Sequence, residues 1–215
     1  EVGGGVVVGA VLDPFGNRFG AIHNPHFAVP PLGATVVASR PMAAAEGALA
    51  PVGISLSVKV PVGPHAAWAR WMSGAAVEAW LGVHANIEAR IGGAWEVFFL
   101  PDAPLGARGG EGVRVLSYLP GRMLSFTWNA PPHHPETRPL FTWVVLLFTA
   151  EDEGSRVDLH HTGWPASGWS EDGTARDDSP WPETFAYFEA AWPHLMEAFA
   201  RGCSEDRGGE PGDAG

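Results

Sequence analysis

The chain has 215 residues, 46% of them hydrophobic, and a formal net charge of −11 at pH 7. That length can bury one sizeable core, so it favours one domain with additional segments over two complete domains. The acidic balance excludes a nucleic-acid-binding surface, because phosphate recognition depends on clustered lysine and arginine.

Three further features of the composition limit the class of protein. No apolar run approaches the roughly 20 residues of a membrane helix, and the first residues lack a signal-peptide pattern, so we expect a cytoplasmic protein that does not bind membranes. The single cysteine, Cys203, excludes an internal disulfide and zinc sites built on cysteine pairs. The ten tryptophans indicate an aromatic-lined interior or groove, because tryptophan is costly to leave in water.

The first 52 residues predict a hairpin followed by a linker. Residues 6–12 form an apolar, strand-like run, the turn signal "DPFGN" follows, and a second apolar run reaches Ile22. We therefore assign residues 1–27 to a terminal hairpin. Residues 28–52 are rich in alanine and proline without apolar periodicity, which predicts a linker.

The main domain, residues 53–202, opens with a strand and two short helices. In "ISLSVKV", residues 54–60, apolar residues alternate with serine and lysine, which predicts a strand buried on one face. Pro64 suits the first position of a short helix, Ser73 the cap of a second helix, and Gly82 its end.

From residue 83 to 163 the apolar period is two, and turn residues recur at short intervals. Short loops between successive strands predict an antiparallel meander. The six expected strands are 83–91, 94–100, 112–119, 122–128, 140–150 and 155–162.

A long helix closes the domain, because large apolar residues recur there at steps of four and three. They form one stripe: Trp181, Phe185, Phe188, Trp192, Leu195 and Phe199. Residues 203–215 are acidic and glycine-rich, which predicts a disordered tail. The order of elements predicts an α+β helix-grip fold, in which a curved antiparallel sheet wraps around the C-terminal helix and leaves a cavity where the two do not touch.

Four stretches of the main domain follow one another in a familiar order: "IEARIGGAWEVFF", "LSYLPGRMLSFTWN", "SRVDLHHTGW" and "AAWPHLMEAF". They resemble the marker stretches of the SRPBCC, or START-like, superfamily, and within it the bacterial relatives of the heat-shock chaperone ATPase activators. This resemblance implies a helix-grip fold with a hydrophobic pocket between sheet and helix. It does not imply one reaction, since members include small-molecule carriers, polyketide cyclase-like enzymes and chaperone co-activators.

The N-terminal stretch "DPFGNRFGAIHNPHF" resembles the final hairpin of the glyoxalase and bleomycin-resistance, or vicinal oxygen chelate, superfamily. Only the end of such a domain is present, and Gly20 stands where metal-using members have a glutamate. We therefore expect a remnant of an upstream domain that holds no metal.

Six residues are the candidate ligand-binding residues: Trp95, Phe99, Trp128, His161, Phe188 and Trp192. His161 ends an inward-facing alternation, and the resemblance places it at the cavity mouth, where it could bind a ligand or transfer a proton. The alternative is a buried histidine bonded to backbone, and each aromatic residue alone could be core. The excess of aromatic residues favours a pocket lining for the set.

No metal, cofactor or catalytic residue is assigned. The histidine pairs at 133–134 and at 23 and 26 lie among prolines with no carboxylate at a ligand-like spacing. No nucleophile elbow, phosphate loop or zinc-protease helix is present.

Three hypotheses of function remain open. The first is a non-catalytic module that binds an apolar or aromatic small molecule in the cavity between sheet and helix. The second is a cyclase-, aromatase- or hydrolase-like enzyme, which needs at least two polar groups converging on that cavity. The third is a chaperone ATPase activator-like module for a protein partner, for which Trp143, Trp164 and Trp169 are interface candidates.

Overall fold

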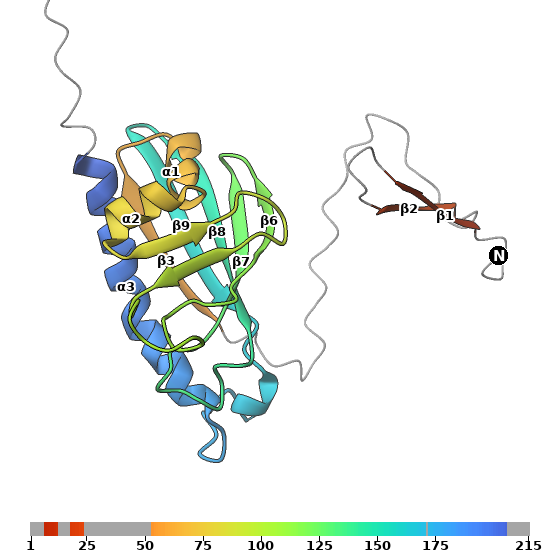
Figure 1. The fold of residues 1–215 in the computed structure, drawn as a ribbon, viewed down its shortest axis with the longest axis vertical. Helices are drawn as coiled ribbons and strands as arrows, with labels where there is room; N and C mark the ends of the chain where they lie inside the picture. Colours follow the sequence, from red (N-terminus) through yellow and green to blue (C-terminus); the bar gives the residue numbers. More distant parts are fainter. Residues whose placement is uncertain (1–6, 13–17, 24–52, 171, 206–215) are drawn as a thin grey trace, which may run out of the picture. The chain divides into compact units, whose positions relative to one another are not determined.

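The computed structural model describes residues 7–12, 18–23, 53–170 and 172–205, which are drawn in colour in Figure 1. The chain divides into two units. In the first, β1 (Val7–Leu12) pairs antiparallel with β2 (Arg18–His23), so the two strands of the predicted hairpin are present. The predicted turn between them and the predicted linker lie outside the described residues.

A five-stranded antiparallel sheet is the centre of the second unit, with the strand order β3-β9-β8-β7-β6. These strands are β3 (Ile54–Val60), β6 (Val115–Leu119), β7 (Met123–Trp128), β8 (Thr142–Glu151) and β9 (Gly154–Thr162). The first strand of the unit pairs with the last. Alternate residues of β9 are buried, as the period of two predicts, because successive side chains point to opposite faces of a sheet.

The predicted six-strand meander is interrupted at its start. β4 (His84–Ile87) and β5 (Trp95–Phe98) form a separate two-stranded sheet, which an isolated bridge between Ala94 and Arg114 connects to the chain before β6. The strands expected at 83–91 and 94–100 are therefore shorter. One reason is Gly92, whose positive φ of 74° turns the chain between them.

Helices α1 (Pro64–Trp71) and α2 (Gly74–Leu81) follow β3 as predicted. Pro64 lies in the first turn of α1, where its missing N–H costs nothing. The Ser73 side chain accepts a hydrogen bond from the first turn of α2, and Gly82 ends that helix in the left-handed conformation.

Helix α3 (Trp181–Glu205) runs along the sheet beside α2 and β3 (Figure 1). Its buried row is Trp181, Thr184, Phe188, Trp192, Met196, Phe199 and Cys203. Phe185 and Leu195, expected in the stripe, are only partly buried. The helix continues to residue 205, so Cys203, expected in the disordered tail, belongs to α3 and is fully buried one turn after Phe199, while residues 206–215 lie outside the described residues. Among the described helices, none is long and apolar enough to cross a membrane.

Aromatic rings fill the space between the sheet and the helices. Trp95 stacks on Phe126 with ring centroids 4.2 Å apart, and Trp71 contacts Phe199 of α3 at 5.2 Å. Aromatic pairs of this kind add to the stabilisation from buried area alone. Most of the tryptophans therefore lie in the core.

Two of the three tryptophans considered as interface residues belong to this interior. Trp164 and Trp169 are both 8% exposed and pack edge-on against Phe185. They are buried because α3 extends past the end of the sheet and covers the segment that follows β9. Trp143 alone of the three lies on the outer face of the sheet, 42% exposed.

Candidate functional site

A cavity of about 390 Å³ lies between α3 and two loops at one end of the sheet. One wall is α3, with Tyr187, Phe188, Ala191, Trp192, Leu195 and Ala198. The opposite wall comes from residues 99–110, which follow β5, from Trp128 at the end of β7, and from residues 129–133, which follow it. The lining is predominantly apolar.

Four of the six candidate ligand-binding residues line this cavity. Phe99 and Trp128 belong to the loop wall, and Phe188 and Trp192 belong to α3. The rings of Trp128 and Trp192 lie 5.2 Å apart, so the two walls meet at this pair. The fold therefore brings these four predicted residues, which come from three separate segments of the chain, to one cavity.

Trp95 does not line the cavity, contrary to expectation. It is 1% exposed, stacks on Phe126 and donates a hydrogen bond from Nε1 to the carbonyl oxygen of Trp71 at 2.8 Å. Its neighbour on the same face of the chain, Phe99, is 45% exposed. The two side chains differ in exposure because Trp95 lies over the middle of the core, whereas Phe99 lies beyond the end of β5.

His161 is also absent from the cavity wall and lies in the core. Its Nδ1 accepts a hydrogen bond from Trp192 Nε1 at 2.9 Å, and its Nε2 lies 2.7 Å from Thr142 Oγ1. Since an indole N–H can only donate, Nδ1 carries no proton, and Nε2–H donates to Thr142. The Thr142 hydroxyl in turn donates to the carbonyl oxygen of Trp128.

The surroundings of His161 keep the imidazole neutral. The ring is fully buried against Trp164, Phe188 and Trp192, and this burial lowers the pKa of His161 to about 3. Both ring nitrogens have hydrogen-bond partners. The residue therefore fixes the position of Trp192 and cannot serve as an acid or base at the cavity.

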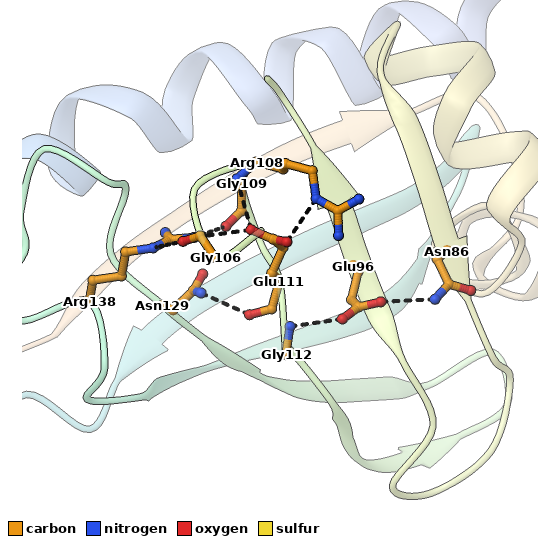
Figure 2. A network of polar contacts seen from close by, with 9 residues as sticks. All are labelled: Asn86, Glu96, Gly106, Arg108, Gly109, Glu111, Gly112, Asn129 and Arg138. Atoms are coloured by element: carbon orange, nitrogen blue, oxygen red, sulfur yellow. Dashed lines mark hydrogen bonds and ion pairs between the residues drawn. The ribbon is translucent and has the colours of Figure 1, made fainter. Parts of the chain in front are cut away.

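Figure 2 shows the polar network that holds the loop wall in place. Arg138 donates from Nε to the carbonyl oxygen of Gly106 at 2.6 Å and from a terminal nitrogen to that of Gly109 at 2.8 Å. It also donates to the carbonyl oxygen of Ala130 and lies 3.7 Å from the carboxylate of Glu111. One side chain thus ties both loops together.

Glu111 is the anionic centre of this network. Its carboxylate accepts hydrogen bonds of 2.8 Å from both the backbone N–H and Nε of Arg108. Burial alone would raise the pKa of Glu111, but these bonds and the ion pair lower it below the ordinary value for glutamate. Burial lowers the pKa of Arg138, an effect that Glu111 opposes, and an arginine remains charged in either case.

The sequence analysis assigned no role to Arg108, Glu111 or Arg138. Their ion pairs and hydrogen bonds join residues as many as 32 positions apart, and no periodicity signals such a contact. One feature of the sequence could have indicated this network: isolated charged residues occur within two loops rich in glycine and proline. A charged side chain in such a loop is either exposed to solvent or forms ion pairs and hydrogen bonds that hold the loop in place.

The histidines at 133–134 both contact α3. His134 is buried and bonds to Thr184, and both imidazole rings pack against Tyr187. Among the described residues no group of three potential metal ligands occurs. The side chain of His23 and the whole of His26 lie outside what the structure describes.

A larger depression of about 800 Å³ lies at the other end of the sheet, beside the turn between β8 and β9. Its lining is charged, and the ion pair between Lys59 and Glu151, 2.8 Å long, lies in it. A ligand there would have to displace water from charged groups. The apolar cavity beside α3 is therefore the stronger candidate.

The curved sheet, the long C-terminal helix and the apolar cavity beside that helix define a START-like helix-grip domain. Residues 61–197 match the family described as "Activator of Hsp90 ATPase homolog 1-like protein". The chain belongs to this family, and the predicted superfamily is confirmed.

Several solved structures are similar to this chain at low sequence identity. Protein MLL2253 of Mesorhizobium loti is similar with a TM-score of 0.51 and 15% identity, covering 72% of this chain and 98% of that protein. CalU16 of Micromonospora echinospora has a TM-score of 0.47 and 14% identity, covering 72% and 78%. The AHSA1-like protein RHE_CH02687 of Rhizobium etli has a TM-score of 0.47 and 16% identity, covering 72% and 82%. No curated protein matches the sequence.

Proposed function

We propose that this domain binds an apolar small molecule in the cavity between α3 and the two loops. The observation that supports the proposal is a cavity of about 390 Å³ walled by Trp128, Phe188 and Trp192 in a domain whose other buried rings pack against one another. Small-molecule sites usually measure about 300–1,000 Å³ and have mostly apolar linings with a few polar groups. Binding would remove apolar surface of both ligand and cavity from water.

The cavity can be filled without deleting any existing contact. Ala191 lines it from α3, whereas the adjacent Ala190 is exposed and does not. Ala191→Phe places a ring in the cavity, and Ala190→Phe makes the same change of helix propensity on the outer surface. The two variants form a matched pair.

Tryptophan fluorescence reports binding, because Trp128 and Trp192 belong to the walls. We expect saturable changes when the protein is titrated with medium-chain aliphatic and bicyclic aromatic compounds. Ala191→Phe should weaken binding at least tenfold, and Ala190→Phe should leave it unchanged. Failure of the whole panel to bind wild type, or equal binding by the two variants, would overturn the proposal.

A second candidate is a protein-binding role, since the family is described by its activation of the Hsp90 ATPase. The supporting observation is the exposure of two apolar residues at the cavity mouth, Phe99 at 45% and Leu100 at 55%. In an Hsp90 ATPase assay, the double variant Phe99→Ser, Leu100→Ser should lose any stimulation that the wild type gives. If wild type gives no stimulation, this candidate is removed.

A further inference from the structure

The charge of the cavity lining differs from that of the chain as a whole. The chain has a net charge of −11, yet none of the described residues that line the cavity is acidic. Arg108 lines it, together with four polar side chains that are not acidic, namely those of Asn129, His133, Tyr187 and His194. Each of these can donate a hydrogen bond. The lining therefore suits a ligand with an apolar body and an acceptor head group.

Two arginines of the loop network pair with the same carboxylate. Arg108 and Arg138 both pair with the single carboxylate of Glu111, through contacts of 2.8 and 3.7 Å. The nearby Glu96 accepts instead from the backbone N–H of Gly112 and the side chain of Asn86. Two cations thus share one anion beside the cavity.

The guanidinium of Arg108 still has donors available for a ligand. Its Nε faces Glu111, whereas Figure 2 draws no interaction from its two terminal nitrogens, and none joins them to another described residue. The guanidinium lies 4.8 Å from the ring centroid of Phe98, which supports it from one side. The free edge of an arginine fork matches the two oxygens of a carboxylate.

We propose that the ligand is an apolar monocarboxylic acid whose carboxylate pairs with the two terminal nitrogens of Arg108 while its hydrocarbon part occupies the cavity. This inference rests on the proposed function and narrows it to one ligand class. The free edge of the Arg108 fork accommodates one carboxylate.

The test compares ligands that differ only in the head group. Decanoate is compared with decanol, and naphthoate with naphthylmethanol, at pH 8, where histidine charge plays little part. Isothermal titration measures the affinity of each for wild type, for Arg108→Gln and for Arg114→Gln. Arg114 is exposed and does not line the cavity, so its variant is the control for loss of one positive charge.

We expect wild type to favour each carboxylate over its alcohol by about tenfold, since one charge-assisted pair at a partly exposed arginine is of that order. Arg108→Gln should abolish the preference, so that carboxylate and alcohol bind this variant equally, and Arg114→Gln should keep it. Equal binding of carboxylate and alcohol by wild type, or a preference that persists in Arg108→Gln, would overturn this inference but not the proposed function. Absence of binding by all four ligands would count against the proposed function itself.

Discussion

Lowering the pH should destabilise this domain through His161. Burial lowers the pKa of His161 to about 3 in the folded protein, whereas an exposed histidine in the unfolded chain has a pKa of about 6.5. Between these values the unfolded chain binds a proton that the folded domain does not. Stability therefore rises with pH across this range, and it is lost progressively as pH falls below about 6.5.

The size of the effect follows from the two pKa values. At pH 5 the solution is about 1.5 pH units below the pKa of the unfolded-state histidine. Protonation of the unfolded chain therefore lowers the free energy of unfolding by about 2 kcal/mol relative to pH 8. The figure depends little on the exact folded pKa, provided that it lies well below 5. The contribution becomes constant only below pH 3, where both states bind the proton.

Urea unfolding at pH 5 and pH 8, followed by circular dichroism, measures this contribution. Other groups titrate as well, including His134, whose pKa is also lowered by burial and by His133. The comparison is therefore made with His161→Gln, which lacks only the one ionisable ring. Between pH 8 and pH 5 the free energy of unfolding of the wild type should fall by about 2 kcal/mol more than that of the variant. An equal loss in the two proteins would refute a neutral, buried His161.

Two further predictions compare paired substitutions by urea unfolding. Trp192→Phe removes the donor to the buried imidazole and should cost about 1–3 kcal/mol more than Trp128→Phe, because the indole N–H of Trp128 is buried without a hydrogen-bond partner among the described residues. Equal costs would contradict the hydrogen-bond assignment. Gly154→Ala should cost more than about 2 kcal/mol, since its φ is 152° and an added Cβ would overlap the carbonyl oxygen of Val60. Gly82→Ala, at φ 74° with open space around it, should cost only about 1–2 kcal/mol. A larger cost for Gly82→Ala than for Gly154→Ala would contradict the steric explanation of both values.

The fold could be predicted because its elements have strong local signals. Strand β3 alternates, α1 begins at Pro64, and α2 has both a serine cap and a glycine end. The split between β4–β5 and the main sheet was not predicted. It depends on how the long segment before β6 folds against β5, and hydrophobic periodicity contains no information about such a non-local contact.

The candidate site was predicted only in part, for a different reason. Alternation tells which face of a strand a residue occupies, and it placed Trp95, Phe99 and His161 on the inner face. It does not tell how far along the strand the core ends. His161 lies against Trp192 of α3 and Trp95 against Trp71 of α1, so their polar atoms bond within the core, whereas Phe99 lies beyond the end of β5 and is exposed.

The position of the cavity explains how one domain can combine a rigid interior with an adaptable site. The inner end of the cavity is Trp192, which His161 fixes through a buried hydrogen bond, so that end belongs to the cooperative core. The opposite wall consists of loops that Arg138 fastens by hydrogen bonds to backbone carbonyls, which any residue supplies. Side chains such as Phe99 and Arg108 can therefore change without loss of that attachment. Under the proposed function, the core would set where a ligand lies, and the loops would set which ligand it is.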